Sequence, residues 1–320
     1  MAIIPMDEEI LPVYDDRIFK ATLTHPDAKP ALIDLISAVI ERKVLDVSIR
    51  GNEPPTMDVE EKNERLDINC VIDDGSQVDV EIQGSRLEIS EGDHRNFINK
   101  SIYYLADLHS SQKSKGIKYS ELVQTYQITF IAYTVFPKRW GFVNKFNLCR
   151  YPNGKPISDQ LNLIIIELSK LREVLKKPAR DMTAIEAWSA FIAYADDPKK
   201  RKVINEILEQ REAMAMASSV LREISKDEHE RARLRSRRMF ETDMTSDLLT
   251  AEARGEIKER KKWKLVITKK DAMIAEKEAV ITEKEAVITE KDVVITEKDA
   301  VITEKDAMIA ELQARLNKYE

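Results

Sequence analysis

The chain has 320 residues, 34% of them charged, and a formal net charge of −6. It is long enough to bury a core, but a mildly acidic protein has no overall field that attracts nucleic acid, so any DNA-binding surface must be a local patch. No apolar stretch approaches the roughly 20 residues that span a membrane, and the run before Asp7 is too short for a signal peptide, so we expect a soluble, cytoplasmic protein.

Helical and strand-like patterns alternate over the N-terminal two-thirds of the chain. Pro30 suits the first turn of a helix, and apolar residues then recur at helical spacing as far as Ile40. β-Branched and aromatic residues mark the strands, and Pro137 ends the longest of them. The expected elements are a helix from Asp16, a helix from Pro30 to Ile40, strands at 44–49, 65–73 and 77–83, a helix at 89–114, and strands at 123–136, 142–149 and 161–168. This order predicts an α/β or α+β fold in which helices flank one central mixed sheet.

The C-terminal third is expected to be helical throughout. From Lys270 the chain contains six tandem copies of a seven-residue unit of the type KEAVITE, and this strict period is typical of a coiled coil. One isoleucine per unit forms an apolar stripe, but the position three or four residues away is charged. Two interpretations of this tail therefore stay open: a weak coiled coil that joins copies of the chain, and a solvated single helix.

The runs 65–73 and 77–83 are expected to pair as a β-hairpin with a three-residue loop, Asp74-Gly75-Ser76, in which glycine adopts the left-handed conformation. Alternate side chains of a strand share a face. One face is then apolar, and the other carries Asp67, Asn69, Asp79, Glu81 and Gln83. This register places Asp67 opposite Gln83 and Asn69 opposite Glu81. Asp67 and Glu81 are then diagonal neighbours, about 7 Å apart at Cα.

Acidic side chains crowded on one face of a hairpin repel one another unless a cation or a basic neighbour offsets the repulsion. Carboxylate oxygens at the spacing of Asp67 and Glu81 suit Mg²⁺ or Mn²⁺. The pattern therefore predicts a divalent-metal site, and an ordinary hairpin with a solvated polar face is the alternative.

These motifs, in their order and spacing, resemble those of the PD-(D/E)XK nucleases, in which an Asp on one strand is followed by Glu-x-Lys on the next. Arg65-Leu66-Asp67-Ile68 and Val80-Glu81-Ile82-Gln83 fit the pattern, with Gln in the Lys position. With the upstream Asp16-x-x-Phe19-Lys20 and the later stretches 101–104 and 110–112, they are similar to the PD-(D/E)XK nuclease family transposases, also called recombination-promoting nuclease (Rpn-like) proteins. The resemblance covers approximately Leu11 to Leu175, and the heptad tail is similar to the variable tails of some members.

The resemblance implies a restriction-endonuclease-like core that cleaves DNA with Mg²⁺ (or Mn²⁺). Asp67 and Glu81 would hold the ion, and the backbone carbonyl of Ile82 would complete its coordination. Asp16 is a further acidic candidate from the first helix, ahead of Asp15, and its alternative role is that of a helix N-cap.

The residue in the Lys position departs from the family pattern. Gln83 can orient a water molecule or a phosphate by hydrogen bonds, but it cannot supply positive charge. Lys20 is the preferred basic group to replace it, and Lys62 is the second choice. The predicted catalytic residues are therefore Asp67, Glu81, Gln83 and Lys20.

The expected organisation has three parts: a nuclease-like domain at 1–180, a helical region with basic patches at 181–265, and the heptad-repeat helix at 266–320. The preferred function is that of a metal-dependent DNA endonuclease of the recombination-promoting type, with DNA as partner and a homo-oligomer formed through the tail. The main rival, which Gln83 keeps open, is a catalytically weakened nuclease fold that acts as a DNA-binding or coiled-coil interaction protein. A purely structural coiled-coil adaptor is a third possibility.

Overall fold

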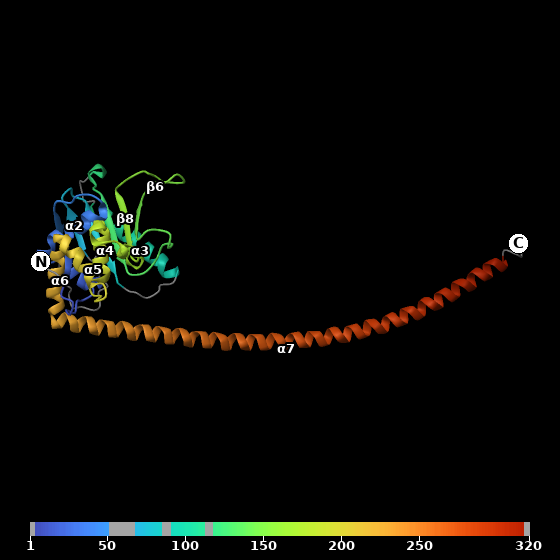
Figure 1. Cartoon of the computed structure of the whole chain (residues 1–320). Coiled ribbons are helices and arrows are strands. Elements are labelled where there is room, and N and C mark those ends of the chain that lie inside the picture. The colour runs from blue at the N-terminus through green and yellow to red at the C-terminus, as the bar shows by residue number, and fades with distance from the viewer. Residues whose placement is uncertain (1–3, 51–67, 85–90, 113–117, 317–320) are drawn as a thin grey trace. The chain divides into compact units, whose positions relative to one another are not determined.

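The computed structural model describes residues 4–50, 68–84, 91–112 and 118–316 (Figure 1). The chain divides into two compact units, Met1–Arg235 and Ser236–Glu320. The first contains the sheet and most of the helices, and the second consists mainly of the continuation of helix α7 (Glu228–Leu316). Among the described residues, no helix combines the length and the hydropathy that a membrane-spanning segment needs.

A six-stranded mixed sheet forms the centre of the first unit, in the order β1-β2-β3-β4-β8-β5. Strands β1, β2 and β3 pair antiparallel, β3, β4 and β8 run parallel, and β5 is antiparallel to β8. A separate ribbon is formed by β6 and β7. The strands are β1 (Val47–Ile49), β2 (Ile68–Ile72), β3 (Gln77–Gln83), β4 (Thr125–Ile131), β5 (Val143–Asn147), β6 (Cys149–Arg150), β7 (Lys155–Pro156) and β8 (Leu161–Glu167). The predicted fold class, a mixed central sheet flanked by helices, is confirmed.

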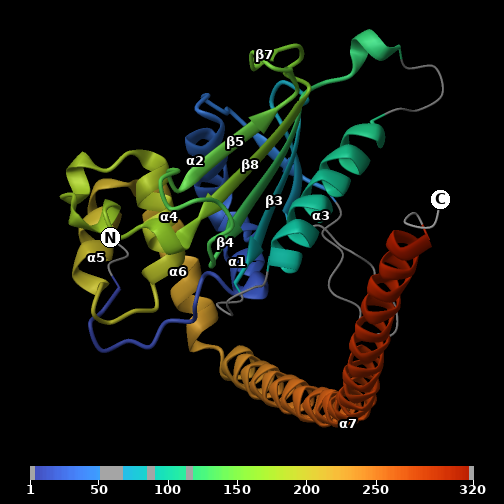
Figure 2. The ribbon, with the colours of Figure 1, turned by 90° about the vertical axis from the view of Figure 1, so that its right-hand side faces the viewer.

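Helices cover both faces of this sheet (Figure 2). On one face, α1, α2 and α4 contribute to the main core, in which Phe19 and Phe130 lie 6.1 Å apart at their ring centroids. On the other face, α3 packs Phe97 and Leu105 against Ile131 and neighbouring apolar residues of β8. The helices are α1 (Asp16–Leu23), α2 (Lys29–Ile40), α3 (Glu91–Ser110), α4 (Ala184–Tyr194), α5 (Arg201–Gln210), α6 (Glu212–Lys226) and α7, with 3₁₀ turns η1 (Pro26–Ala28), η2 (Tyr119–Glu121), η3 (Leu168–Lys170), η4 (Val174–Lys176) and η5 (Ala179–Asp181).

The hairpin forms with the predicted faces but with a different register. Asn69 lies opposite Asp79, and not opposite Glu81, because the loop begins one residue earlier than expected. The amide of Gly75 donates to the carbonyl of Ile72, and the amide of Ile72 donates to the carbonyl of Ser76, so the loop is residues 73–75. Gly75 has a φ of +86°, which confirms that the turn uses the left-handed conformation that glycine tolerates.

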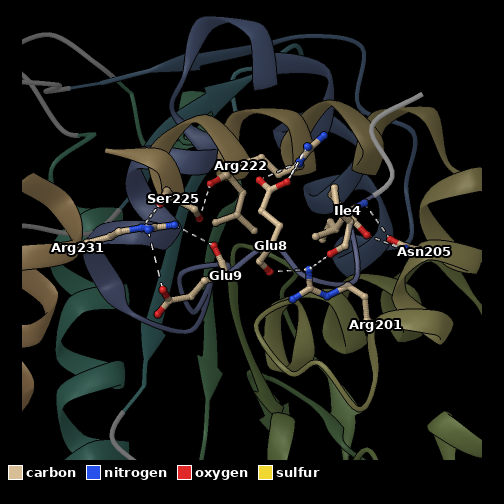
Figure 3. A network of polar contacts seen from close by, with 10 residues as sticks. Ile4, Glu8, Glu9, Arg201, Asn205, Arg222, Ser225 and Arg231 are labelled. Atoms are coloured by element: carbon tan, nitrogen blue, oxygen red, sulfur yellow. Dashed lines mark hydrogen bonds and ion pairs between the residues drawn. The ribbon is translucent and has the colours of Figure 1, made fainter. Parts of the chain in front are cut away.

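The segment before α1 is held against α5, α6 and the start of α7 by a polar network (Figure 3). The central contact is a bidentate ion pair in which Arg222 donates to Oε2 of Glu8 at 2.7 Å and to its Oε1 at 3.1 Å. Those hydrogen bonds lower the pKa of Glu8. Arg201, which is buried, donates to the carbonyls of Pro5 and Glu8 at 3.0 and 3.3 Å. This network fixes the path by which the N-terminal segment reaches α1.

Two breaks divide the helical region that follows α4. Arg211 has an extended backbone (φ −134°) and separates α5 from α6. Asp227 is extended as well and separates α6 from α7, and its carboxylate accepts from the amide of His229 at 2.8 Å in the first turn of α7. Neither break carries a Gly or Pro residue, so composition gave no signal for them.

Candidate functional site

The acidic residues of β3 are buried, on the face of the sheet against which α3 packs. Asp79 is fully buried and Glu81 is 7% exposed. The predicted alternative, a hairpin with a solvated polar face, is therefore wrong for β3. Carboxylates in such a place are costly to bury unless hydrogen bonds or a cation satisfy them, so this face of β3 is a candidate for a functional site.

Strand β4 supplies polar partners to this face, since its residues alternate in phase with those of β3. Gln127 lies beside Asp79 in the parallel register and donates to its Oδ2 atom at 2.7 Å. Thr129 occupies the corresponding place beside Glu81. The buried face of β3 and β4 therefore carries two pairs of polar neighbours, Asp79 with Gln127 and Glu81 with Thr129.

Several oxygen atoms on this face of β2 and β4 have no hydrogen-bond partner in the part of the chain that the structure describes. They are the hydroxyl oxygen of Thr129, the Oε1 atom of Gln127 and the Oδ1 atom of Asn69. Buried oxygens without donors are rare in folded proteins and usually mark bound water or an ion. Carboxylate and hydroxyl oxygens are hard ligands of the kind that Mg²⁺ and Mn²⁺ prefer, so the chemistry of Glu81 and of Thr129 beside it fits a divalent cation.

Gln83 is oriented by a hydrogen bond from the adjacent strand region. The hydroxyl of Tyr133 donates to its Oε1 atom at 2.7 Å, and the ring of Tyr133 makes an edge contact with Phe97 of α3 at a centroid distance of 6.0 Å. No hydrogen bond from the Nε2 group of Gln83 to a described residue is found, and this group can donate two. The half-buried amide is thus fixed through its oxygen and can donate through its nitrogen.

The start of α1 lies against the end of β3. Gly84, directly after Gln83, is so close to the backbone of Tyr14 that a Cβ atom at this position would overlap the Tyr14 carbonyl oxygen. Two residues beyond Tyr14 the helix begins at Asp16. The fold therefore brings the predicted Asp16–Lys20 motif to the end of the strand that carries Glu81 and Gln83.

Within that motif, Asp15 is the N-cap of α1, because its carboxylate accepts from the amides of Arg17 and Ile18. The alternative role for Asp16 as the N-cap is therefore wrong. Asp16 is the first helical residue and accepts from the amide of Arg17 at 2.7 Å. Lys20 is half-buried on the last turn, and no described contact joins its side chain to Glu81 or Gln83.

Two predicted residues, Asp67 and Lys62, lie outside the described residues, so the structure gives neither a position. Ile82 is described, and it pairs with Phe130 between Glu81 and Gln83, with its side chain in the main core. Within the described ranges, no three His, Cys, Asp or Glu side chains are grouped so as to hold a metal ion. The two-acid metal site formed by Asp67 and Glu81 therefore stays a prediction.

Sequence reasoning missed the contribution of β4. Thr125, Gln127 and Thr129 alternate with apolar residues in the same way as the acids of the hairpin, and this period of two is the signal that could have identified a polar face. The aromatic and β-branched residues of the segment dominate its pattern and predict a strand without indicating a polar face. Tyr133 lies beyond the end of β4 and carries no periodic signal.

A second buried carboxylate, Glu167, lies at the end of β8 and is fully satisfied. It accepts from the amides of Val135 and Phe136, at 2.7 and 3.0 Å, and from Asn144 at 3.0 Å, and it forms an ion pair with Lys170. These contacts tie the loop after β4 to the sheet. Glu167 thus has a structural role, and the charge of Lys170 is engaged in the ion pair with it.

The sheet order, the helices on both faces and the Glu-x-Gln pair beside a buried polar row define a protein with a restriction-endonuclease-like fold. A family model described as PD-(D/E)XK nuclease family transposase matches residues 13–251, and the chain belongs to that family. No curated protein and no solved structure matches the chain. The predicted family is therefore confirmed, and nuclease or transposase-like function is supported.

Proposed function

We propose that this protein is a Mg²⁺-dependent (or Mn²⁺-dependent) DNA endonuclease whose metal is held by Glu81 and Asp67. The observation that carries the proposal is the burial of Glu81 beside Thr129, whose hydroxyl oxygen has no hydrogen-bond partner among the described residues. The family to which the chain belongs supports phosphodiester chemistry at this strand. The Ile82 carbonyl and Asp16 are proposed as additional ligands.

When bound, a divalent cation lowers the pKa of a coordinated water and stabilises negative charge on a phosphate oxygen. In this chain, Glu81 and Asp67 contribute the carboxylates that bind it. Gln83 orients a water molecule or a phosphate oxygen through its Nε2 group, because Tyr133 holds its Oε1 atom. Lys20 is proposed to supply the positive charge that Gln83 lacks.

A catalytically weakened nuclease fold that only binds DNA is the second candidate, and one observation favours it. The residue in the Lys position is an amide already engaged by Tyr133, and Lys170, which follows β8 at the same end of the sheet, is paired with Glu167. Positive charge at the transferring phosphate normally contributes strongly to such reactions. If no cation replaces it, binding would persist while turnover is lost.

The deciding experiment is conversion of supercoiled plasmid to nicked and linear forms in the presence of Mg²⁺ or Mn²⁺. We expect cleavage by the full chain, no cleavage with a chelator, and loss of activity in Asp67→Ala and Glu81→Ala. The matched control is Glu173→Ala, which removes an exposed glutamate whose ion pair in the described structure is with surface Lys176. Plasmid binding without cleavage in all of these proteins would favour the weakened fold.

We also propose that the heptad tail joins copies of the chain. In α7 the stripe isoleucines are about half exposed, from 54 to 56%; they are Ile281, Ile288, Ile295 and Ile302. The charged residues of 270–311 are never three or four positions apart in sequence, so they cannot pair along one helix, and no ion pair forms among the described side chains of this stretch. The same helix of a second copy could bury the isoleucine stripe and pair with the charged residues.

Light scattering tests the tail. The full chain should have a mass at least twice that of the single chain, and a chain that ends at Arg254 should have the mass of one chain. Equal association states for the two proteins would exclude the tail as the oligomeric contact. The truncation at Arg254 falls inside the proposed helical region 181–265. It also lies beyond the last residue of the family match, 251.

A further inference from the structure

A two-stranded ribbon, β6 and β7, lies at the end of the sheet away from α1 (Figure 2). Its strands pair antiparallel, with Arg150 directly opposite Lys155. The turn between them is closed by a hydrogen bond from the amide of Gly154 to the carbonyl of Arg150 at 2.9 Å, and Gly154 has a φ of +67°. The ribbon therefore holds two cationic side chains side by side.

Like charges directly opposite each other on a ribbon are destabilising, and the neighbouring sequence supplies no acid that would offset this pair. Between Glu121 and Asp159 the sequence contains no acidic residue. Asp159 itself accepts a hydrogen bond from Gln124 at 2.6 Å. No salt bridge to Arg150 or Lys155 is found among the described residues, so the repulsion is left for an external anion to relieve.

The ribbon also exposes apolar surface that its own fold does not use. Tyr151, in the turn, is 92% exposed, and Ile157, just after β7, is 71% exposed. A two-stranded ribbon is marginal by itself and is normally stabilised by packing of its side chains. Exposed aromatic groups beside cations are the combination that nucleic-acid-binding proteins use to contact bases and phosphates.

We propose that the β6–β7 ribbon is a second DNA contact, separate from the Glu81 site, and that Arg150 and Lys155 neutralise backbone phosphates while Tyr151 contacts the groove. A two-stranded ribbon has the width that the major groove of duplex DNA admits. The inference rests on the proposed function for its choice of partner, since a net charge of −6 does not by itself attract DNA.

The register of the sheet gives the separation of the two contacts. Gln83 pairs with Ile131 and Ile131 with Glu167, at the end of β8, whereas β5 leads to the ribbon from Asn147, which pairs near the start of β8. The seven residues of β8 span roughly 20 Å at about 3.3 Å per residue. A duplex that reaches both contacts must therefore be longer than about six base pairs, at about 3.4 Å each.

The test measures binding of the full chain to a labelled duplex of about 30 base pairs, long enough to cover both contacts, in a chelating buffer that prevents cleavage. The test variant is Arg150→Gln/Lys155→Gln. The matched control is Lys199→Gln/Lys202→Gln, which removes the same charge from exposed lysines next to and within α5. Anisotropy is followed as a function of salt concentration.

We expect the ribbon variant to bind about tenfold more weakly near 0.1 M salt, and its log–log salt slope to fall by nearly 2, since each phosphate contact contributes about 0.9. The control variant should bind as the wild type does. Because the substitutions remove a repulsive pair, the thermal midpoint should stay the same or rise. Tyr151→Ala should weaken binding without changing the salt slope, because it removes no charge.

A cleavage assay distinguishes the role of the ribbon from that of the metal site. With Mg²⁺, the ribbon variant should need more DNA for half-maximal rate but reach the wild-type maximal rate at saturation. If it binds and cleaves as the wild type does, the ribbon inference is overturned while the proposed function stands. A wild-type protein that neither binds nor cleaves DNA would overturn both. Binding to anionic vesicles but not to DNA, through the same residues, would also overturn the inference.

Discussion

Gly84 lies where the chain before α1 crosses the end of β3, and an alanine at this position should separate them. A Cβ atom at residue 84 would overlap the carbonyl oxygen of Tyr14 and come within 3.0 Å of its carbonyl carbon. The obstacle is backbone and cannot rotate away. The Tyr14 side chain is held as well, because its hydroxyl donates to Asp196 at 3.2 Å. Gly84→Ala must therefore move the start of α1 relative to Gln83.

The size of the effect follows from that overlap. Carbon and carbonyl oxygen atoms are in ordinary contact at about 3.3–3.6 Å, so the two backbones must move apart by on the order of 1 Å. Overpacking of this kind costs about 1–3 kcal/mol of stability, and a displacement of about 1 Å at a catalytic site can reduce the rate about 100-fold. We expect both effects in Gly84→Ala.

The assays are the urea midpoint and the initial rate of plasmid cleavage, and Gly141→Ala is the control. A Cβ atom at residue 141 would meet only the carbonyl oxygen of Val143, at 4.0 Å, so this substitution should be neutral or stabilise by less than about 1 kcal/mol. If Gly84→Ala keeps both the wild-type midpoint and the wild-type rate, the argument that α1 is positioned through Gly84 is refuted. Loss of stability without any loss of rate would refute only its link to the site.

Three further predictions concern the rest of the core unit. Glu8→Gln should lower the free energy of unfolding by about 1–2 kcal/mol, because Arg222 loses a charge-assisted, partly buried partner; an unchanged urea midpoint would contradict this. Burial acts to raise the pKa of Asp74, but hydrogen bonds, chiefly from the Arg42 guanidinium, lower it to about 2. The stabilisation that ionised Asp74 provides is therefore complete above about pH 4 and is lost as the pH falls toward 2. The stability difference between wild type and Asp74→Asn, at most about 1 kcal/mol at this exposed pair, should shrink over that interval and not at higher pH. Burial raises the pKa of the Cys70 thiol to about 12, so at pH 8 a thiol reagent should modify exposed Cys149 alone in the native protein and both cysteines after unfolding.

Much of the fold follows from patterns in the sequence, because most central strands are apolar runs and two of the helices have clear starting residues. Pro30 lies in the first turn of α2, and Thr183 caps α4 with its side-chain oxygen. The hairpin register could not be fixed in this way. Loops 73–75 and 74–76 both keep the apolar residues on one face, and only the hydrogen bonds around Gly75 distinguish them.

The environment of the site was less predictable than its residues. Glu81 and Gln83 stand out through their alternation in the sequence, but whether their face is solvated depends on where α3 packs. That placement is decided by contacts between segments far apart in the chain, such as Phe97 with Tyr133. The ion pair between Glu8 and Arg222 could not be predicted either, since local sequence patterns do not indicate which residues far apart in the chain form ion pairs.

The central claim is that Glu81 holds a divalent cation, and Mn²⁺ binding to the DNA-free protein tests it most directly. Electron paramagnetic resonance counts free Mn²⁺ during a titration of wild type, Glu81→Gln and the control Glu173→Gln. We predict one site per chain in the wild type and the control, and at least a tenfold weaker site in Glu81→Gln, since one of its carboxylate ligands is replaced by a neutral amide. Equal Mn²⁺ affinity in all three proteins would contradict the account.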